Sequence, residues 1–70
     1  MKYIEINKEP IELFKFLKFS GLLPSGGEAK VAIENSEILV NGEVETQKRK
    51  KIFSGDTVTF NEETITAKAL

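Results

Sequence analysis

Four residues between positions 25 and 30 have the chemistry to bind an anion. They are Ser25, Gly26, Gly27 and Lys30. Ser25 followed three residues later by Glu28 is a capping-box pattern, which predicts that a helix begins here. Gly26 and Gly27 carry no side chains, so the first turn would expose free backbone N–H groups at the positive end of the helix dipole, where a phosphate can bind. The alternative is that these glycines only let the loop enter the helix without a clash.

A second candidate is a run of four adjacent cations, Lys48, Arg49, Lys50 and Lys51. Such a run could neutralise several phosphates of a nucleic acid. If the run is extended, alternate side chains point to opposite faces, and only about half of them would contact one ligand. An irregular segment does not have this restriction. Lys15, Lys18 and Lys30 could frame a groove beside it. The alternative is a solvated run that keeps an edge strand from aggregating.

The composition argues against an enzyme. The 70 residues include no His and no Cys, so no Ser has a His base, and the common zinc sites are excluded. Gly26-Gly27 lacks the Gly-Lys-Ser/Thr ending of a P-loop. Paired carboxylates need a pocket to become an acid and a base, and so short a chain has little room for one. We therefore expect no catalytic activity, no cofactor and no metal.

Length and charge indicate one small domain over residues 1–70. Hydrophobic residues make up 40% of the chain, enough for a modest core, and the net charge is −1. The cations are concentrated, whereas the acids are spread out. No signal peptide is evident, and no apolar run approaches the ~20 residues that span a bilayer. These features predict a soluble cytoplasmic protein that is a monomer and has no membrane contact.

The first half of the chain predicts one strand and two helices. Residues 3–6 have strand character, and Pro10 fits the first turn of a helix over residues 11–19. Gly21 is expected to end this helix in the left-handed conformation. The second helix is expected over residues 26–34, ending at a left-handed Asn35. Its core-facing residues would be Ala29, Ala32 and Ile33.

The second half predicts a hairpin and further strands. Asn41-Gly42 lies between the β-rich segments 37–40 and 43–46, which is a strong hairpin signal. A two-residue turn would pair Val40 with Glu43, and a bulge at Gly42 is the alternative. Strands are also expected at 57–60, with Val58 and Phe60 facing the core, and at 64–66. The predicted fold class is α+β: a helix-turn-helix-like pair of helices on a small, mostly antiparallel sheet.

Taken together, these motifs resemble the small RNA-binding domain named after small-subunit ribosomal protein S-four, and in particular its stand-alone bacterial subgroup. The resemblance covers about Ile11 to Val58, and a Gly-Asp turn completes it. Four motifs occur in the family's order and spacing. They are Phe16-Leu17-Lys18, Ser25-Gly26-Gly27-Glu28-Ala29-Lys30, Val40-Asn41-Gly42-Glu43-Val44-Glu45-Thr46 and the basic run that follows.

The resemblance implies the alpha-L fold and a non-catalytic role in binding structured RNA, ribosomal or transfer RNA, mainly through phosphates. The contact residues that it implies are Lys18, Ser25, Gly26, Gly27, Lys30, Lys48, Arg49, Lys50 and Lys51. The sequence departs from the family at Asn35-Ser36, where many members have Gly, and at Gln47, where close relatives have a cation.

A duplex or hairpin RNA is expected rather than a single strand, because Tyr3 and Phe19 are the only aromatic residues expected outside the core. The alternative function is a protein-interaction module, for example on the ribosome, that keeps the fold but has weak or no RNA affinity. Nucleic-acid-guided DNA binding is a third option.

Overall fold

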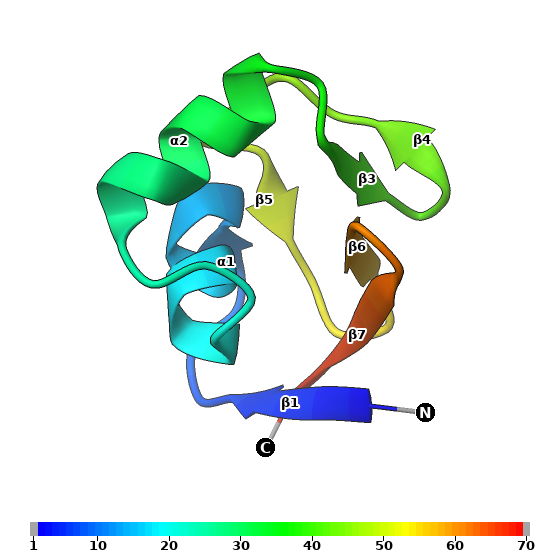
Figure 1. Ribbon diagram of the computed structural model, residues 1–70. Helices are drawn as coiled ribbons and strands as arrows, with labels where there is room; N and C mark the ends of the chain where they lie inside the picture. The colour runs from blue at the N-terminus through cyan, green and yellow to red at the C-terminus, as the bar shows by residue number, and fades with distance from the viewer. Residues whose placement is uncertain (1, 70) are drawn as a thin grey trace.

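Two helices pack against a five-stranded sheet in the computed structural model, which describes residues 2–69 (Figure 1). The helices are α1 (Leu13–Ser20) and α2 (Gly26–Glu34). The sheet has the order β1-β7-β6-β3-β4, with strands β1 (Lys2–Ile6), β3 (Ile38–Val40), β4 (Glu43–Val44), β6 (Thr57–Phe60) and β7 (Glu63–Ala69). A second, two-stranded sheet pairs β2 (Ile11–Glu12) with β5 (Lys51–Ile52). Only the β1–β7 pair is parallel among the described strands. The predicted α+β class is confirmed.

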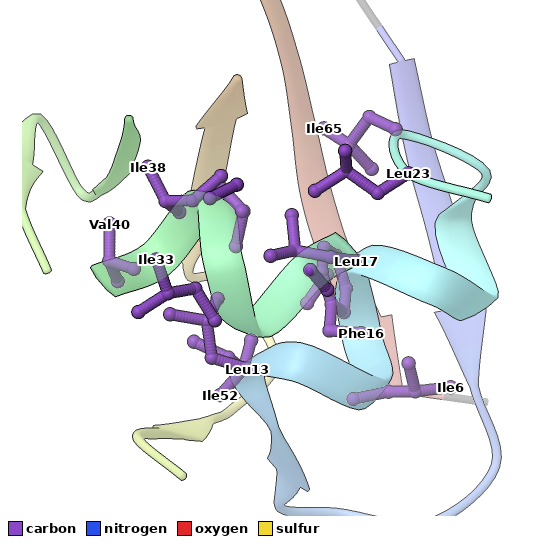
Figure 2. Packing of buried hydrophobic residues seen from close by; sticks show 14 residues of the cluster. Ile6, Leu13, Phe16, Leu17, Leu23, Ile33, Ile38, Val40, Ile52 and Ile65 are labelled. Carbon is purple, nitrogen blue, oxygen red and sulfur yellow. The ribbon is translucent and has the colours of Figure 1, made fainter. Parts of the chain in front are cut away.

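The core lies between the helices and the sheet, and every described element except β2 and β4 contributes to it (Figure 2). Its largest fully buried side chains are Phe16, Leu13, Leu17, Ile33, Ile38, Ile52 and Val58. The predicted positions Ala29, Ala32 and Ile33 are buried, and Phe60 packs partly buried against the cluster. Because both helices share this core with the strands, their relative positions are fixed by packing.

The start of α1 differs from the prediction. Ile11 and Glu12, expected in the helix, form β2 and pair with Ile52 and Lys51 of β5. Pro10 therefore precedes a strand and is not in the first helical turn. The reason is tertiary: two residues with helical periodicity gain backbone hydrogen bonds from a distant segment, which local pattern does not reveal.

The end of α1 and both bounds of α2 agree with the prediction, but the residue that turns the chain after α2 does not. Gly21 ends α1 with a φ of 83°, and α2 spans Gly26–Glu34 as expected. Asn35 was expected to be left-handed, but its φ is −87°; Ser36 takes that conformation instead, with a φ of 63°. The Asn35 N–H donates to Val31 O at 3.0 Å, which is a helical hydrogen bond. The chain therefore turns one residue later than predicted.

The hairpin register is that of a simple two-residue turn. Val40 pairs with Glu43 and Leu39 with Val44, while Asn41 and Gly42 have φ values of 52° and 85°. Positive φ at both turn positions matches the right-handed twist of the strands, so no bulge is needed. Beyond Val44 one more backbone bond joins the hairpin, from the Glu45 N–H to Ile38 O at 3.0 Å, and β4 itself is a short edge strand of two residues.

The last strand is longer than the predicted 64–66 segment. β7 spans Glu63–Ala69 because it pairs on both sides, with β6 and with β1. Neither helix in residues 2–69 is long and apolar enough to cross a membrane.

Candidate nucleic-acid interface

The basic segment, residues 48–51, is attached by its backbone to the start of α1. The N–H of Leu13 donates to Lys50 O at 2.8 Å, and the N–H of Phe14 donates to Lys48 O at 3.1 Å. N–H groups in the first turn of a helix have no partner within the helix, and Glu12 at the N-cap supplies no side-chain bond. Carbonyl groups of the basic segment therefore complete the α1 N-terminus, and this fixes the segment in place.

The basic segment is irregular over residues 48–50, with a turn at Lys48 and Arg49, and only Lys51 belongs to a strand. The Lys50 N–H donates to Gln47 O at 3.1 Å, and regular pairing begins only with β5 at Lys51. All four cationic residues are exposed. The limit that an extended strand would set, with alternate side chains on opposite faces, does not apply to this irregular shape.

The start of α2 is capped as the sequence predicts. Ser25 Oγ accepts a hydrogen bond from the Glu28 N–H at 3.2 Å. The reciprocal bond from the Glu28 carboxylate to the Ser25 N–H is not among the hydrogen bonds of residues 2–69. Within the same residues, no hydrogen bond is donated by the N–H groups of Gly26 or Gly27. Half of the capping box is formed, and two backbone donors remain at the positive end of the helix.

The fold does not require glycine at either of these positions. Neither Gly26 nor Gly27 has a positive φ. A Cβ atom at Gly26 would lie 3.7 Å from Phe14 Cδ2, and one at Gly27 would lie 3.9 Å from Ser25 Oγ, both ordinary contacts. The alternative explanation, that glycine is needed to avoid a clash, is therefore not supported by the structure.

Phe14 is the residue around which the candidate site is built. Lys30 Nζ lies 4.7 Å from the centroid of its ring, and Lys15 Nζ lies 5.9 Å from it. Gly26 lies beside the same ring, and the Phe14 N–H holds Lys48 O. Both helices and the basic segment thus meet at one residue: the half-buried ring of Phe14 lies beside Gly26 and contacts Lys30 by a cation–π interaction, and its backbone N–H binds the basic segment.

The sequence prediction missed Phe14, which was not among the predicted contact residues. A signal was present, because Phe14 and Phe16 are two positions apart and two such residues do not face the same side of a helix. Phe16 is fully buried, so Phe14 has to point elsewhere. Lys30, a predicted contact residue, is half-buried over the Phe14 ring.

The remaining predicted residue, Lys18, lies one turn along α1 from Phe14. It is exposed and lines a groove that also includes Phe14, Lys15 and Gly26. Lys15 was not among the predicted contact residues, although its charge was noted as part of a basic frame. Its Nζ lies 3.4 Å from Glu12 Oε1, an exposed ion pair that leaves the ammonium group accessible.

The opposite side of α2 has the reverse charge. Residues 34–45, which form the end of α2 and the β3–β4 hairpin, contain four Glu and no Lys or Arg. A smaller groove of about 330 Å³ lies on this side; Leu23, Val31 and Phe60 line it, with Glu28 and Glu37 at its rim. Among residues 2–69, no group of three His, Cys, Asp or Glu residues lies close enough together to hold a metal ion.

Comparison with known proteins identifies curated relatives of this chain. The chain is 44% identical over 61 residues to YbcJ of Escherichia coli (strain K12), whose name gives RNA binding as its expected role; the match covers 86% of this chain and 87% of YbcJ. It is 40% identical over 55 residues to RlbA of Bacillus subtilis (strain 168), whose name gives ribosome maturation as its expected role, covering 79% and 78% of the two chains.

A solved structure and a family model complete the comparison. The solution structure of Escherichia coli YbcJ, described as revealing an alpha-L motif involved in RNA binding, superposes with a TM-score of 0.74 at 40% identity and covers 99% of this chain and 89% of that one. The family model of the S4 domain matches residues 4–68. The chain therefore belongs to the S4 domain family and has the alpha-L fold.

Proposed function

We propose that this protein is a non-catalytic domain, spanning residues 1–70, that binds structured RNA in the cytoplasm. Family membership and the names of the relatives support RNA as the ligand. The ribosome-related name of RlbA makes ribosomal RNA the first choice, with transfer RNA as the second. The proposed contact residues are Lys18, Ser25, Gly26, Gly27, Lys30, Lys48, Arg49, Lys50 and Lys51, and we add Lys15 and Phe14 to them because both lie at the start of α1, where the Phe14 ring lies beside Lys30 and Gly26.

The observation that carries the proposal is the convergence of separate cationic segments on Phe14. Its ring holds Lys30 and Lys15, and its backbone N–H holds the basic segment. Cations fixed at defined positions on a folded surface can match the spacing of phosphates on a structured RNA, and phosphate contacts supply most of the affinity in such complexes. The unpaired N–H groups of Gly26 and Gly27 would add backbone contacts to one phosphate.

The first experiment is a titration of a structured ribosomal RNA fragment, with a double-stranded DNA of equal length as control. We expect saturable binding that prefers RNA and weakens by about ten-fold or more between about 50 and 200 mM salt, because counterions are released from each neutralised phosphate. Lys30→Glu and Arg49→Glu should each weaken binding without unfolding the domain. Absence of binding at the lower salt would rule out RNA as the direct ligand.

A second candidate function is a protein-interaction module. The acid-rimmed apolar groove beside α2 favours it, because Leu23, Val31 and Phe60 offer apolar contact while Glu28 and Glu37 would attract a basic protein segment. Under this alternative, Lys30→Glu and Arg49→Glu would leave partner binding intact. The same two variants therefore distinguish the two functions.

A further inference from the structure

An open groove of about 880 Å³ runs between α1 and the loop of residues 7–10 that joins β1 to β2. Its walls are apolar at Ile6, Pro10, Ile11, Phe14 and Phe19. The volume lies within the range of small-ligand sites, about 300–1,000 Å³. Such a space on so small a domain is far larger than phosphate contact alone requires.

The rim of this groove is cationic. Lys8, Lys15 and Lys18 line it, against a single carboxylate, Glu12, which is already paired with Lys15. One wall carries an aromatic ring without cover: Phe19 is 59% exposed, whereas Phe16 of the same helix is fully buried. An apolar floor, an exposed ring and three ammonium groups together suit a ligand that has both an aromatic face and negative charge.

The groove is continuous with the candidate RNA interface. Phe14, Lys15 and Gly26 line the groove and also form the convergence point of α1, α2 and the basic segment. A ligand in the groove would therefore be connected to an RNA backbone lying along the start of α2 and the basic segment. A nucleotide of that same RNA is the ligand that meets these conditions of charge and position.

We propose that the groove binds one unpaired nucleotide of the RNA, with its base stacked on Phe19 and its phosphates close to Lys15 and Lys18. The proposal rests on the RNA-binding function proposed above and adds the form of RNA that is recognised. A base inside a duplex is stacked between its neighbours and cannot reach a protein groove, so the nucleotide has to come from a bulge or loop. A bulged or looped hairpin replaces the plain duplex or hairpin that the sequence indicates.

The test compares two RNA hairpins that differ by one unpaired nucleotide in the stem, with 2-aminopurine at that position as a fluorescent base. We expect the bulged hairpin to bind about five-fold or more tightly than the perfect one, the scale of a single base–aromatic stack. The 2-aminopurine fluorescence should change on binding. Each hairpin is titrated against the intact chain and its variants at one fixed salt concentration.

Three substitutions at Phe19 separate stacking from general apolar contact. Phe19→Ala and Phe19→Leu should both abolish the preference for the bulge while leaving affinity for the perfect hairpin unchanged, because Leu keeps an apolar side chain but has no aromatic face. Phe19→Tyr should retain the preference. Phe53→Ala is the matched control: Phe53 is also an exposed aromatic residue, 47% accessible, but it does not line the groove.

The outcomes distinguish this inference from the function on which it rests. Equal binding of the two hairpins, or a bulge preference that survives in Phe19→Leu, would overturn the nucleotide site and leave RNA binding intact. No binding of either hairpin would overturn both. If the backbone resonances of Phe19 and Lys15 shift with an acidic amphipathic peptide but not with the bulged RNA, the groove is a protein site and the inference is wrong.

Discussion

The two sides of α2 differ in charge, although the residues that form them alternate along one short helix. On one side, Gly26 and Lys30 lie against Phe14, beside the groove that Lys15 and Lys18 line. On the other side, Glu28 and Val31 line the smaller groove with Glu37. The helix thus separates a cationic aromatic surface from an acidic apolar one.

Because of this difference, net charge is a poor guide to the ligand of this protein. A chain with ten cationic and eleven acidic residues has a net charge of −1, which on its own argues weakly against a polyanion as partner. At physiological salt, charges act over about 8 Å, so the local surface decides which ligand binds. The predictions below test whether the two sides act independently.

The largest effect is expected from reversing charge within the basic segment. Lys48→Glu combined with Arg49→Glu should weaken RNA binding by about 100-fold at low salt, because attractive phosphate contacts become repulsive. Both side chains are exposed and the segment is held by backbone carbonyls, so the fold should persist. Fluorescence anisotropy gives the affinity, and circular dichroism checks the fold.

The matched control is Glu34→Lys combined with Glu37→Lys, which changes net charge by the same amount in the opposite sense on the acidic side. We expect less than about a three-fold change in RNA affinity, because salt limits the reach of these exposed charges to about 8 Å. A gain comparable to the loss in the basic variant would show that net charge, and not the local surface, governs binding.

A smaller effect is expected at Phe14. Phe14→Leu keeps most of the apolar contact but removes the ring beneath Lys30, so RNA affinity should fall about two- to five-fold, the scale of an exposed cation–π contact. Urea unfolding should show a loss of about 1 kcal/mol from imperfect repacking. Unchanged affinity together with lower stability would limit Phe14 to a packing role.

Ser25 allows stability and binding to be separated. Ser25→Ala removes the cap on the Glu28 N–H and should lower the free energy of unfolding by about 1 kcal/mol. Ser25→Asp keeps a capping oxygen, so stability should be retained, but its carboxylate would repel a phosphate at the start of α2. Urea unfolding and RNA titration of both variants should therefore rank them in opposite order. The same rank in both assays would remove the start of α2 from the RNA interface.

The smallest effect is expected on the acidic side, at the turn after α2. Ser36→Gly should raise the free energy of unfolding by about 0.5–1 kcal/mol, because Ser36 has a left-handed backbone that glycine adopts at lower cost. RNA affinity should not change. Asn35→Gly is the control. Asn35 has a negative φ of −87°, which any residue adopts, so glycine should not raise the free energy of unfolding there. A stabilising Asn35→Gly would contradict this explanation.

Local chemistry in the sequence was enough to predict much of this protein. The cap at Ser25, the left-handed Gly21 and the Asn41-Gly42 turn each depend on residues within a few positions of one another. Hydrophobic periodicity likewise located α2 and its buried residues Ala29, Ala32 and Ile33. The two candidate anion-binding segments were also identified, because runs of cations and bare helix starts are visible in sequence.

The way in which those segments are joined could not be predicted, because it depends on contacts between residues far apart in the sequence. Ile11 and Glu12 became a strand because Lys51 and Ile52 pair with them. The pairing of these two strands also brings Lys48 O and Lys50 O to the N–H groups of the first turn of α1. The basic segment therefore lies next to Phe14, whose ring contacts Lys30. A sequence pattern records which groups need partners, but it does not record which distant groups satisfy them, because that depends on how the buried side chains of both helices pack against the sheet.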